Sequence, residues 1–176
     1  KSFTTAGKKQ EPRPYFLAVG RFIPYKKFDL LIKTFEKNGL PLKLAGRGPE
    51  LEKCMELAKN AKNIEFLGFV LDEDLPKLYA NARAFLFPAE EDFGLTPIEA
   101  MASGTPVIFY NAGGAIETAG PVGVPFDVQT VENLQLAIEK FEGNIENFSS
   151  EKMKAQAEKF SEEKFKKEIL EFVRNI

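Results

Sequence analysis

The chain has 176 residues, a usual size for one globular domain with a sizeable core. Its 24 Lys and Arg against 26 Asp and Glu give a net charge of −2, which argues against a nucleic-acid partner. The absence of histidine excludes a Ser-His-Asp triad, a histidine general base and a histidine metal ligand. The single cysteine, Cys54, excludes an internal disulfide and lies on the apolar face of a predicted helix, which indicates a core residue.

A polar stretch opens the chain at residues 1–14, and it lacks the apolar centre of a signal peptide. We interpret it as a linker in front of a domain that spans residues 15–176. The first residue is lysine rather than methionine, so we expect the sequence to be a piece of a longer protein. No apolar run approaches the roughly 20 residues that a membrane-spanning helix needs.

After this stretch, short apolar runs alternate with segments of helical periodicity. We predict strands at residues 15–20, 42–46, 64–67, 84–87, 107–109 and 123–126, the last at an edge because Pro125 cannot donate to a ladder. We predict helices over residues 26–38, from 50, from 72, from 96, over 131–141 and over 165–173. This alternation is typical of an α/β fold, a Rossmann-like parallel sheet with helices on both faces.

Capping patterns predict where several of these helices begin and end. Thr96, Pro97 and Glu99 fit the N-cap, first and third positions of a helix, a capping box, and Gly104 fits the position after its end. Asp72 and Ser161 are the predicted N-caps of two others. Capping alone would explain Glu99.

Ligands of such sheets bind beyond the carboxyl ends of the strands, so the loops there are the places to search. Arg21 and Lys26 follow the first strand, and their side chains suit phosphate oxygens. Two solvated surface cations are an equally good reading of this pair. A glycine pair, Gly113-Gly114, follows the fifth strand and is weak evidence by itself.

The stretch from Glu91 to Glu99 joins the fourth strand to a helix and carries a carboxylate at each end. Gly94 between them lets a ligand approach the backbone. Free amides at a helix start favour an anion, and two flanking carboxylates suit a ligand that also brings hydroxyl groups. A nucleotide-sugar has both features.

Two other patterns point away from alternative functions. The Gly46-Arg47-Gly48 turn resembles the start of a dinucleotide fingerprint, but Leu51 stands where the third glycine belongs, which argues against a dehydrogenase. An acidic run at residues 72–74 resembles a metal-binding Asp-x-Asp, but helix capping accounts for it. We therefore expect no metal and no other cofactor.

Together these motifs resemble the carboxyl-terminal, donor-binding domain of GT-B retaining glycosyltransferases of group 1, in a family that includes mannosyltransferases. The segments that carry the resemblance occur in the family's order at residues 19–26, 44–50, 66–70, 91–102, 104–108 and 113–114. Two departures are Lys27 and Arg47, which stand where the family often has glycine and an acid. They bear on the choice of nucleobase.

The resemblance implies a role for each matching residue. Arg21 and Lys26 would hold the donor diphosphate, Glu91 would bind sugar hydroxyls and Glu99 the ribose, with Arg21, Lys26 and Glu91 forming the catalytic set. The remaining donor-binding positions implied are Gly20, Gly46, Gly48, Phe69, Val70, Phe93, Gly94, Leu95 and Thr96. The donor would be a GDP- or UDP-linked sugar, with GDP-mannose first, and the acceptor a glycan or lipid-linked sugar held by an amino-terminal domain that this chain lacks.

The resemblance further implies that this domain alone transfers little or no sugar. It implies a cytoplasmic protein of polysaccharide biosynthesis, or one at the inner face of the membrane by peripheral association of the parent. Two alternatives stay open: a non-catalytic nucleotide-binding module, and a GT-B phosphorylase or epimerase.

Overall fold

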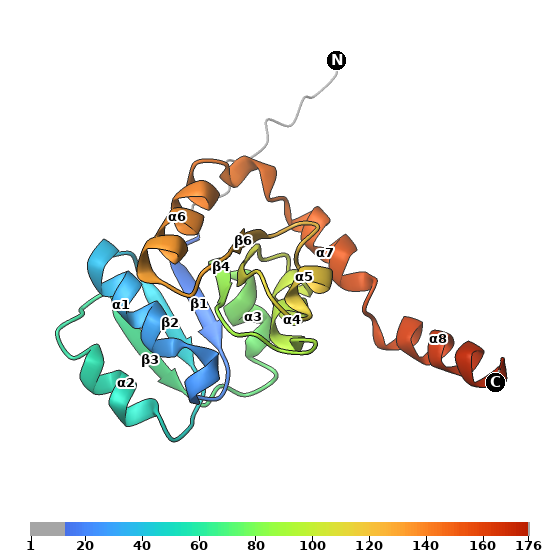
Figure 1. Cartoon of the computed structure of the whole chain (residues 1–176), viewed down its shortest axis with the longest axis horizontal. Coiled ribbons are helices and arrows are strands. Elements are labelled where there is room, and N and C mark those ends of the chain that lie inside the picture. The colour runs from blue at the N-terminus through green and yellow to red at the C-terminus, as the bar shows by residue number, and fades with distance from the viewer. Residues whose placement is uncertain (1–12, 176) are drawn as a thin grey trace, which may run out of the picture.

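Six apolar runs form the strands of one parallel sheet in the computed structural model, which describes residues 13–175 (Figure 1). Most of the predicted linker at residues 1–14 therefore lies outside the described residues. The strands, in chain order, are β1 (Tyr15–Val19), β2 (Leu42–Ala45), β3 (Ile64–Gly68), β4 (Ala82–Phe87), β5 (Val107–Tyr110) and β6 (Val124–Phe126). Each agrees with its predicted range to within two residues at either end.

The strand order is β3-β2-β1-β4-β5-β6. After β1, the chain adds β2 and β3 on one side of it and then β4, β5 and β6 on the other side. The predicted α/β Rossmann-like class is confirmed, and β6 lies at an edge as its proline required. The order reverses between the neighbouring strands β1 and β4, and ligands of this fold class bind beyond the carboxyl ends of the strands at such a point.

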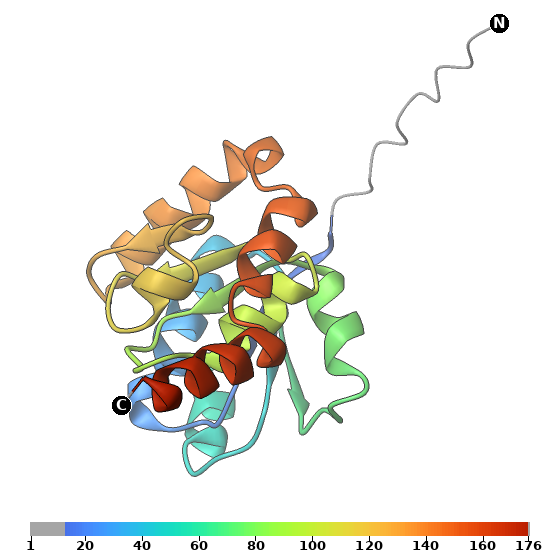
Figure 2. The same ribbon diagram turned by 90° about the vertical axis from the view of Figure 1, so that its right-hand side faces the viewer.

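Helices cover both faces of the sheet. On one face lie α1 (Phe28–Asn38), α2 (Leu51–Leu57) and α6 (Val131–Glu142); on the other lie α3 (Leu75–Ala80), α4 (Leu95–Ala102), α5 (Ala115–Thr118) and α7 (Ser150–Glu158). Two single-turn 3₁₀ helices span Pro24–Lys26 and Ile145–Asn147. Figure 2 shows α7 running beside α4, against which it packs.

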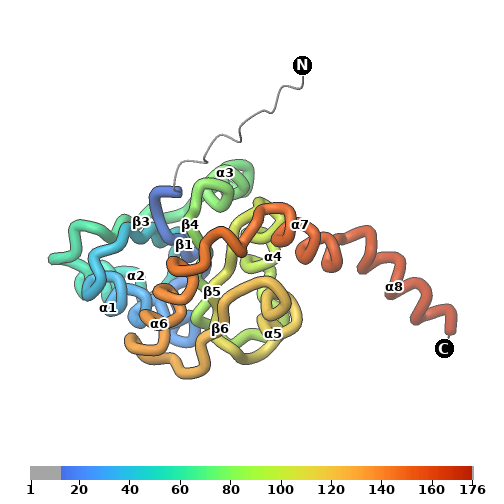
Figure 3. The backbone as a smooth tube through the Cα atoms, turned by 90° about the horizontal axis from the view of Figure 1, so that it is seen from above, coloured from blue at the N-terminus to red at the C-terminus, as the bar shows by residue number. Residues whose placement is uncertain are grey.

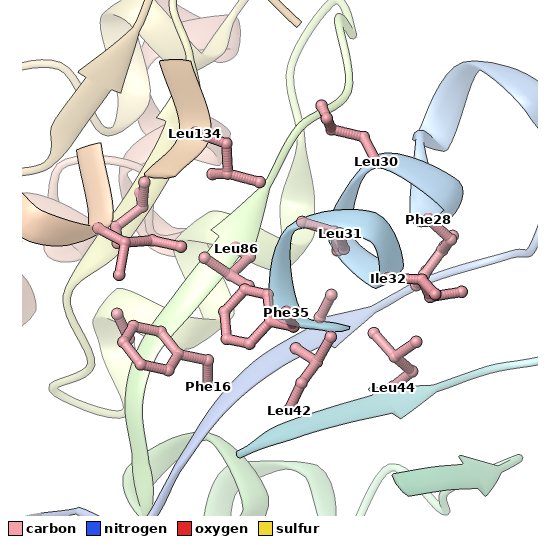
Figure 4. Close-up of a cluster of buried hydrophobic side chains, with 14 of the residues drawn as sticks. Phe16, Phe28, Leu30, Leu31, Ile32, Phe35, Leu42, Leu44, Leu86 and Leu134 are labelled. Carbon is pink, nitrogen blue, oxygen red and sulfur yellow. The ribbon is translucent and has the colours of Figure 1, made fainter. Parts of the chain in front are cut away.

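The side chains of each strand alternate between two apolar layers. Phe16 of β1 faces the α1 side, where it meets Phe35 edge-on with ring centroids 5.3 Å apart, and Leu44 and Leu86 fill the same layer (Figure 4). Leu17 faces the opposite layer with Phe85 and Met101. Each such buried side chain contributes roughly 1.5–3 kcal/mol, so the two layers fix the sheet on which the loops stand.

The prediction of a capping box at Thr96 was wrong. Helix α4 begins at Leu95, two residues before Pro97, the first helical residue that the capping box predicts. The reason is that Gly94 takes the N-cap position with φ of 80°. Only glycine adopts this left-handed conformation without steric cost. Pro97 thus becomes the third helical residue, where its missing N–H would lack an intrahelical partner anyway. The helix ends as predicted: Gly104 follows the C-cap, and its N–H donates to the Met101 carbonyl.

Two other helix starts also differ from the patterns. Asp74, not Asp72, is the N-cap of α3, because the N–H groups of Asp74 and Leu75 both donate to the Leu71 carbonyl and close a turn first. Helix α1 begins at Phe28 rather than residue 26, because the chain makes a 3₁₀ turn and then places Lys27 in the left-handed region, at φ 55°. Ser161 is the N-cap of α8, as predicted.

The last helix, α8 (Glu162–Arg174), points away from the rest of the domain (Figure 3). Its apolar residues, which the sequence pattern places on one face, are exposed: Phe165, Ile169, Leu170, Phe172 and Val173. Among the helices of residues 13–175, none is both long and apolar enough to cross a membrane.

Candidate functional site

Three loops meet at the carboxyl ends of the central strands: residues 20–27 after β1, residues 88–94 after β4, and residues 111–114 after β5. The first two flank the point where the strand order reverses. They carry Lys26 and Glu91, two of the residues that the sequence predicted to act on the donor. The third packs against the second through backbone contacts.

Lys26 and Glu91 form an ion pair between the ammonium Nζ and the carboxylate Oε1. Both side chains are largely buried, at 15% and 19% exposed. The ammonium also lies near the rings of Tyr25 and Phe87, 5.7 and 5.6 Å from their centroids. The aromatic rings and the low exposure limit solvent screening, so each charge depends on the other for compensation.

Glycines allow the Glu91 loop to lie close to the loop after β5. The N–H of Gly114 donates to the Glu91 carbonyl at 2.7 Å, and Gly113 has φ of 58°. A Cβ on Gly113 would lie 2.2 Å from the same carbonyl oxygen, which no side chain tolerates. The glycine pair, weak evidence in the sequence, thus holds the backbone that presents Glu91.

Gly46 and Gly48 serve a similar purpose for the loop after β1. A Cβ on Gly46 would meet the Gly20 carbonyl oxygen at 1.8 Å, and one on Gly48 would meet the Phe22 backbone nitrogen at 2.6 Å. The Phe22 N–H donates to the Arg47 carbonyl at 2.9 Å. These contacts assign both glycines a structural role, the close approach of two loops. A donor-binding role for them and for Gly20 stays a prediction.

The amino end of α4 opens at the same edge of the sheet. Gly94 packs on Phe87, with an added Cβ only 3.0 Å from the ring. Leu95 and Thr96 are the first two helical residues, so their N–H groups have no partner within the helix. Such amides favour an anion. Phe93 and Leu95 are 46% and 65% exposed beside them.

Glu99 lies one turn further along α4, on an exposed face. Its Oε2 accepts a hydrogen bond of 2.9 Å from the hydroxyl of Tyr79, which belongs to α3. Tyr79 stands at an apolar position of its helical period, so the sequence pattern indicates a core residue and does not mark it as part of the site. Burial and the nearby Glu99 charge both raise the pKa of Tyr79 well above its ordinary value, so the phenol keeps its proton.

The remaining predicted residues are accessible at the surface. Arg21 is exposed on the loop after β1. Phe69 follows β3, is 58% exposed, and its ring lies 5.3 Å from the guanidinium carbon of Arg47. Phe69 and Val70 also line an open depression along α3.

Among the described residues, the acidic run at residues 72–74 belongs to no cluster that resembles a metal site. Across residues 13–175, no three or more Asp, Glu or Cys side chains gather in a way that could hold a metal ion. The expectation that no metal or cofactor takes part stays a prediction.

Residues 3–163 match the family model described as Glycosyl transferases group 1. The chain is 35% identical over 135 residues to O-antigen chain mannosyltransferase B of Escherichia coli, covering 70% of this chain and 35% of that protein. It is 31% identical over 144 residues to a GDP-mannose-dependent alpha-(1-6)-phosphatidylinositol monomannoside mannosyltransferase of Mycobacterium tuberculosis, covering 72% and 37%. The chain thus spans about a third of the length of these curated relatives.

Solved structures share the fold. The HepE protein of Anabaena, in complex with UDP and glucose, superposes with a TM-score of 0.82 at 21% identity, over 94% of this chain and 49% of that one. Sucrose-phosphate synthase from Thermosynechococcus elongatus gives the same TM-score at 26% identity, over 93% and 45%. Each match covers nearly all of this chain and about half of the larger protein.

Proposed function

Because the chain belongs to the glycosyl transferases group 1 family and has the fold of a GT-B carboxyl-terminal domain, we propose that it binds the nucleotide-sugar donor of a retaining hexosyltransferase. The donor is GDP-mannose, and the acceptor is a glycan or a lipid-linked sugar. The observation that carries the proposal is the Lys26–Glu91 ion pair at the carboxyl ends of β1 and β4. In this pair a cation, which suits phosphate oxygens, lies beside a carboxylate, which accepts hydrogen bonds from hydroxyls.

Arg21, Lys26 and the first amides of α4 bind the diphosphate. Negative charge gathers on this group as the bond to the sugar breaks, and fixed donors stabilise that charge in the transition state. An arginine fork and a lysine point charge suit phosphate oxygens. These groups take the place of a divalent metal, so the proposed reaction needs no cofactor.

Glu91 binds hydroxyl groups of the donor sugar, and its carboxylate pairs with Lys26 next to the proposed phosphate site. Phe93, Gly94 and the backbone of the same loop border the sugar. The carboxylate accepts hydrogen bonds but has no proton to give, which suits orientation of the sugar rather than acid catalysis.

The nucleoside lies on the β3 side of the site. Glu99 accepts from the ribose hydroxyls, and Phe69 and Val70 border the base. Arg47, which stands over the Phe69 ring, supports guanine as that base. A guanidinium donates two parallel hydrogen bonds to the adjacent O6 and N7 acceptors of guanine, whereas adenine offers a donor at one of these positions.

The similar mannosyltransferases are two to three times as long as the matched segment, and one of them is named for its dependence on GDP-mannose. An amino-terminal domain of the parent protein supplies the acceptor site, and this chain alone transfers little or no sugar. The parent acts in polysaccharide synthesis, in the cytoplasm or at the inner face of the membrane. A non-catalytic nucleotide-binding module, or a phosphorylase or epimerase of the same architecture, is the second candidate.

Calorimetric titration of the 176-residue chain with GDP, UDP and ADP, and then with GDP-mannose and UDP-glucose, tests the proposal. We expect GDP to bind most tightly and GDP-mannose to bind at least as well. Equal, negligible heats for all ligands would contradict donor binding. Sugar transfer at the rate of a full-length relative would contradict the expected inactivity of the isolated domain.

Arg21→Ala provides the sharper comparison, since Arg21 is exposed and its loss leaves the fold intact. Its hydrogen bonds to phosphate are worth roughly 1.5–3 kcal/mol, so GDP affinity should fall by about ten- to a hundredfold. Arg174→Ala removes an arginine at the far end of α8 and serves as the matched control with unchanged affinity. An equal GDP affinity in Arg21→Ala and the wild type would refute the phosphate assignment.

A further inference from the structure

Tyr79 is a buried tyrosine whose hydroxyl reaches an exposed carboxylate. Only 1% of its surface is accessible, yet its phenol donates to Oε2 of Glu99 at 2.9 Å. The two residues lie on different helices, Tyr79 on α3 and Glu99 on α4. The phenol therefore links the core to a side chain at the surface of the candidate site.

Packing holds the phenol in one place. The ring meets Phe85 of β4 edge-on, with centroids 5.5 Å apart and planes at 72°. The backbone carbonyl of Tyr79 accepts a hydrogen bond of 2.6 Å from the Thr105 hydroxyl. Burial and the Glu99 charge raise the pKa of the phenol above its ordinary value, so the hydroxyl keeps its proton and donates at neutral pH.

A buried phenol needs some hydrogen-bond partner, and a backbone carbonyl is sufficient. Tyr15 of β1 shows this arrangement, because its hydroxyl donates to the carbonyl of Leu78 in α3 at 2.9 Å. Tyr79 differs because its partner is the carboxylate of Glu99, an exposed residue of α4. A carboxylate accepts up to about four hydrogen bonds, so the contact occupies Oε2 in part and leaves Oε1 available.

A glutamate on a helix surface otherwise samples many rotamers, and fixing it on binding costs conformational entropy. We propose that Tyr79 is a positioning residue that holds Glu99 in the rotamer in which its free oxygen accepts from the ribose hydroxyls of the donor. This inference rests on the proposed function, in which Glu99 binds the ribose. Under this inference α3 takes part in nucleotide recognition through Tyr79, although the apolar periodicity of the helix indicates only a core role for this residue.

The test measures the dissociation constants of a nucleoside diphosphate and of its 2′,3′-dideoxy analogue for the wild type and Tyr79→Phe. The nucleotide is whichever of GDP, UDP and ADP binds the wild type most tightly. We expect the wild type to prefer the ribose form and Tyr79→Phe to lose about three- to tenfold of that preference. Glu99→Gln should also reduce the preference for the ribose form. The double variant Tyr79→Phe/Glu99→Gln should show little further reduction of this preference, because the two residues act together.

Tyr15→Phe is the matched control, because it removes a similar phenol hydrogen bond to α3 without touching Glu99. The preference is a ratio measured within each variant, so a general loss of stability does not mimic the effect. If the wild type prefers the ribose form and Tyr79→Phe keeps that preference in full, the inference is overturned and the proposed function stands. If the wild type binds no nucleoside diphosphate, the proposed function itself fails.

Discussion

Lys26 and Glu91 form an ion pair between the loops of the two strands, β1 and β4, at which the strand order reverses. Lys26 follows β1 and Glu91 follows β4, so the contact depends on β1 and β4 being neighbours in the sheet. Both charges are largely removed from water, and each compensates the other. A diphosphate that binds Lys26 must compete with Glu91, and sugar hydroxyls would give Glu91 new partners.

Glu91→Gln tests this competition. The substitution leaves Lys26 with an uncompensated charge, so we expect GDP to bind about three- to tenfold more tightly. The gain should not extend to GDP-mannose, because the neutral amide accepts more weakly from the sugar hydroxyls. Calorimetry with both ligands measures the two affinities. Glu142→Gln, which breaks the pair between Glu142 and Arg83 away from the site, should change neither.

The same pair complicates the Lys26→Ala variant. Loss of the ammonium by itself should weaken diphosphate binding and change the fold little. The structure adds that the change would leave the Glu91 carboxylate largely buried and unpaired, which destabilises the fold. Arg21→Ala is for this reason the cleaner test of the phosphate site.

Gly113→Ala should damage the site through the backbone. The added Cβ would overlap the Glu91 carbonyl and would sit at φ 58°, so we expect a loss of about 2–3 kcal/mol in the free energy of unfolding. Gly68→Ala places a Cβ at φ 65° with no atom within 4 Å, and should cost only about 1 kcal/mol. Urea denaturation measures both. Equal losses would show that the Glu91 loop moves away freely.

Lys27→Gly should stabilise the protein. Lys27 has φ of 55°, where a side chain costs about 1–2 kcal/mol. Glycine removes this cost, but its greater conformational entropy in the unfolded chain cancels roughly half of the gain. We expect a net gain of about 0.5–1 kcal/mol in chemical denaturation. Gly39→Ala, with φ of 70° and open space around it, is the reverse control and should lose stability. A loss in Lys27→Gly would mean that the lysine side chain itself stabilises the turn.

Cys54 predicts a specific dependence of stability on pH. Burial raises the pKa of the thiol from 9.0 to about 11, and the charges of Glu50 and Asp29 add smaller contributions in the same direction. Between these values the unfolded chain releases a proton that the folded chain keeps, so the free energy of unfolding falls as the pH rises.

Comparison of the wild type with Cys54→Ala over pH 8 to 11 measures this contribution. We expect the wild type to lose stability more steeply above pH 9, because the variant lacks the titrating group, while the tyrosines titrate alike in both. Parallel curves would contradict a shifted thiol. Alkylation of the folded wild type at pH 8 should accordingly be slow, since the thiolate is the reactive form.

Much of the fold was predictable because its signals are local. The apolar runs that became β1 to β6 are short and nearly continuous, as strands covered on both faces must be, and Pro125 marked an edge. Cys54 is buried as its helical face indicated. Helix α7 was not predicted because it has few apolar residues, among them Met153 and Ala157. These form too weak a periodic pattern to indicate a helix, and their burial depends on packing against α4.

The wrong helix starts share one cause, which is competition between local rules. Thr96, Pro97 and Glu99 satisfied the pattern of a capping box, but Gly94 could adopt a conformation that started the helix earlier. Asp72 satisfied an N-cap pattern, but Leu71 closed the turn through its carbonyl. A pattern identifies a possible cap, and the approaching backbone decides which one forms.

The sequence by itself determined which segments form the six strands and most of the helices, and hence which loops lie at the carboxyl edge, since periodicity and turn residues act over a few positions. Only the tertiary structure decided which loops meet. The contact of Lys26 with Glu91 follows from the strand order, and that of Tyr79 with Glu99 from the packing of α3 beside α4. Both join residues far apart in the chain, whose proximity depends on how buried surfaces pack together.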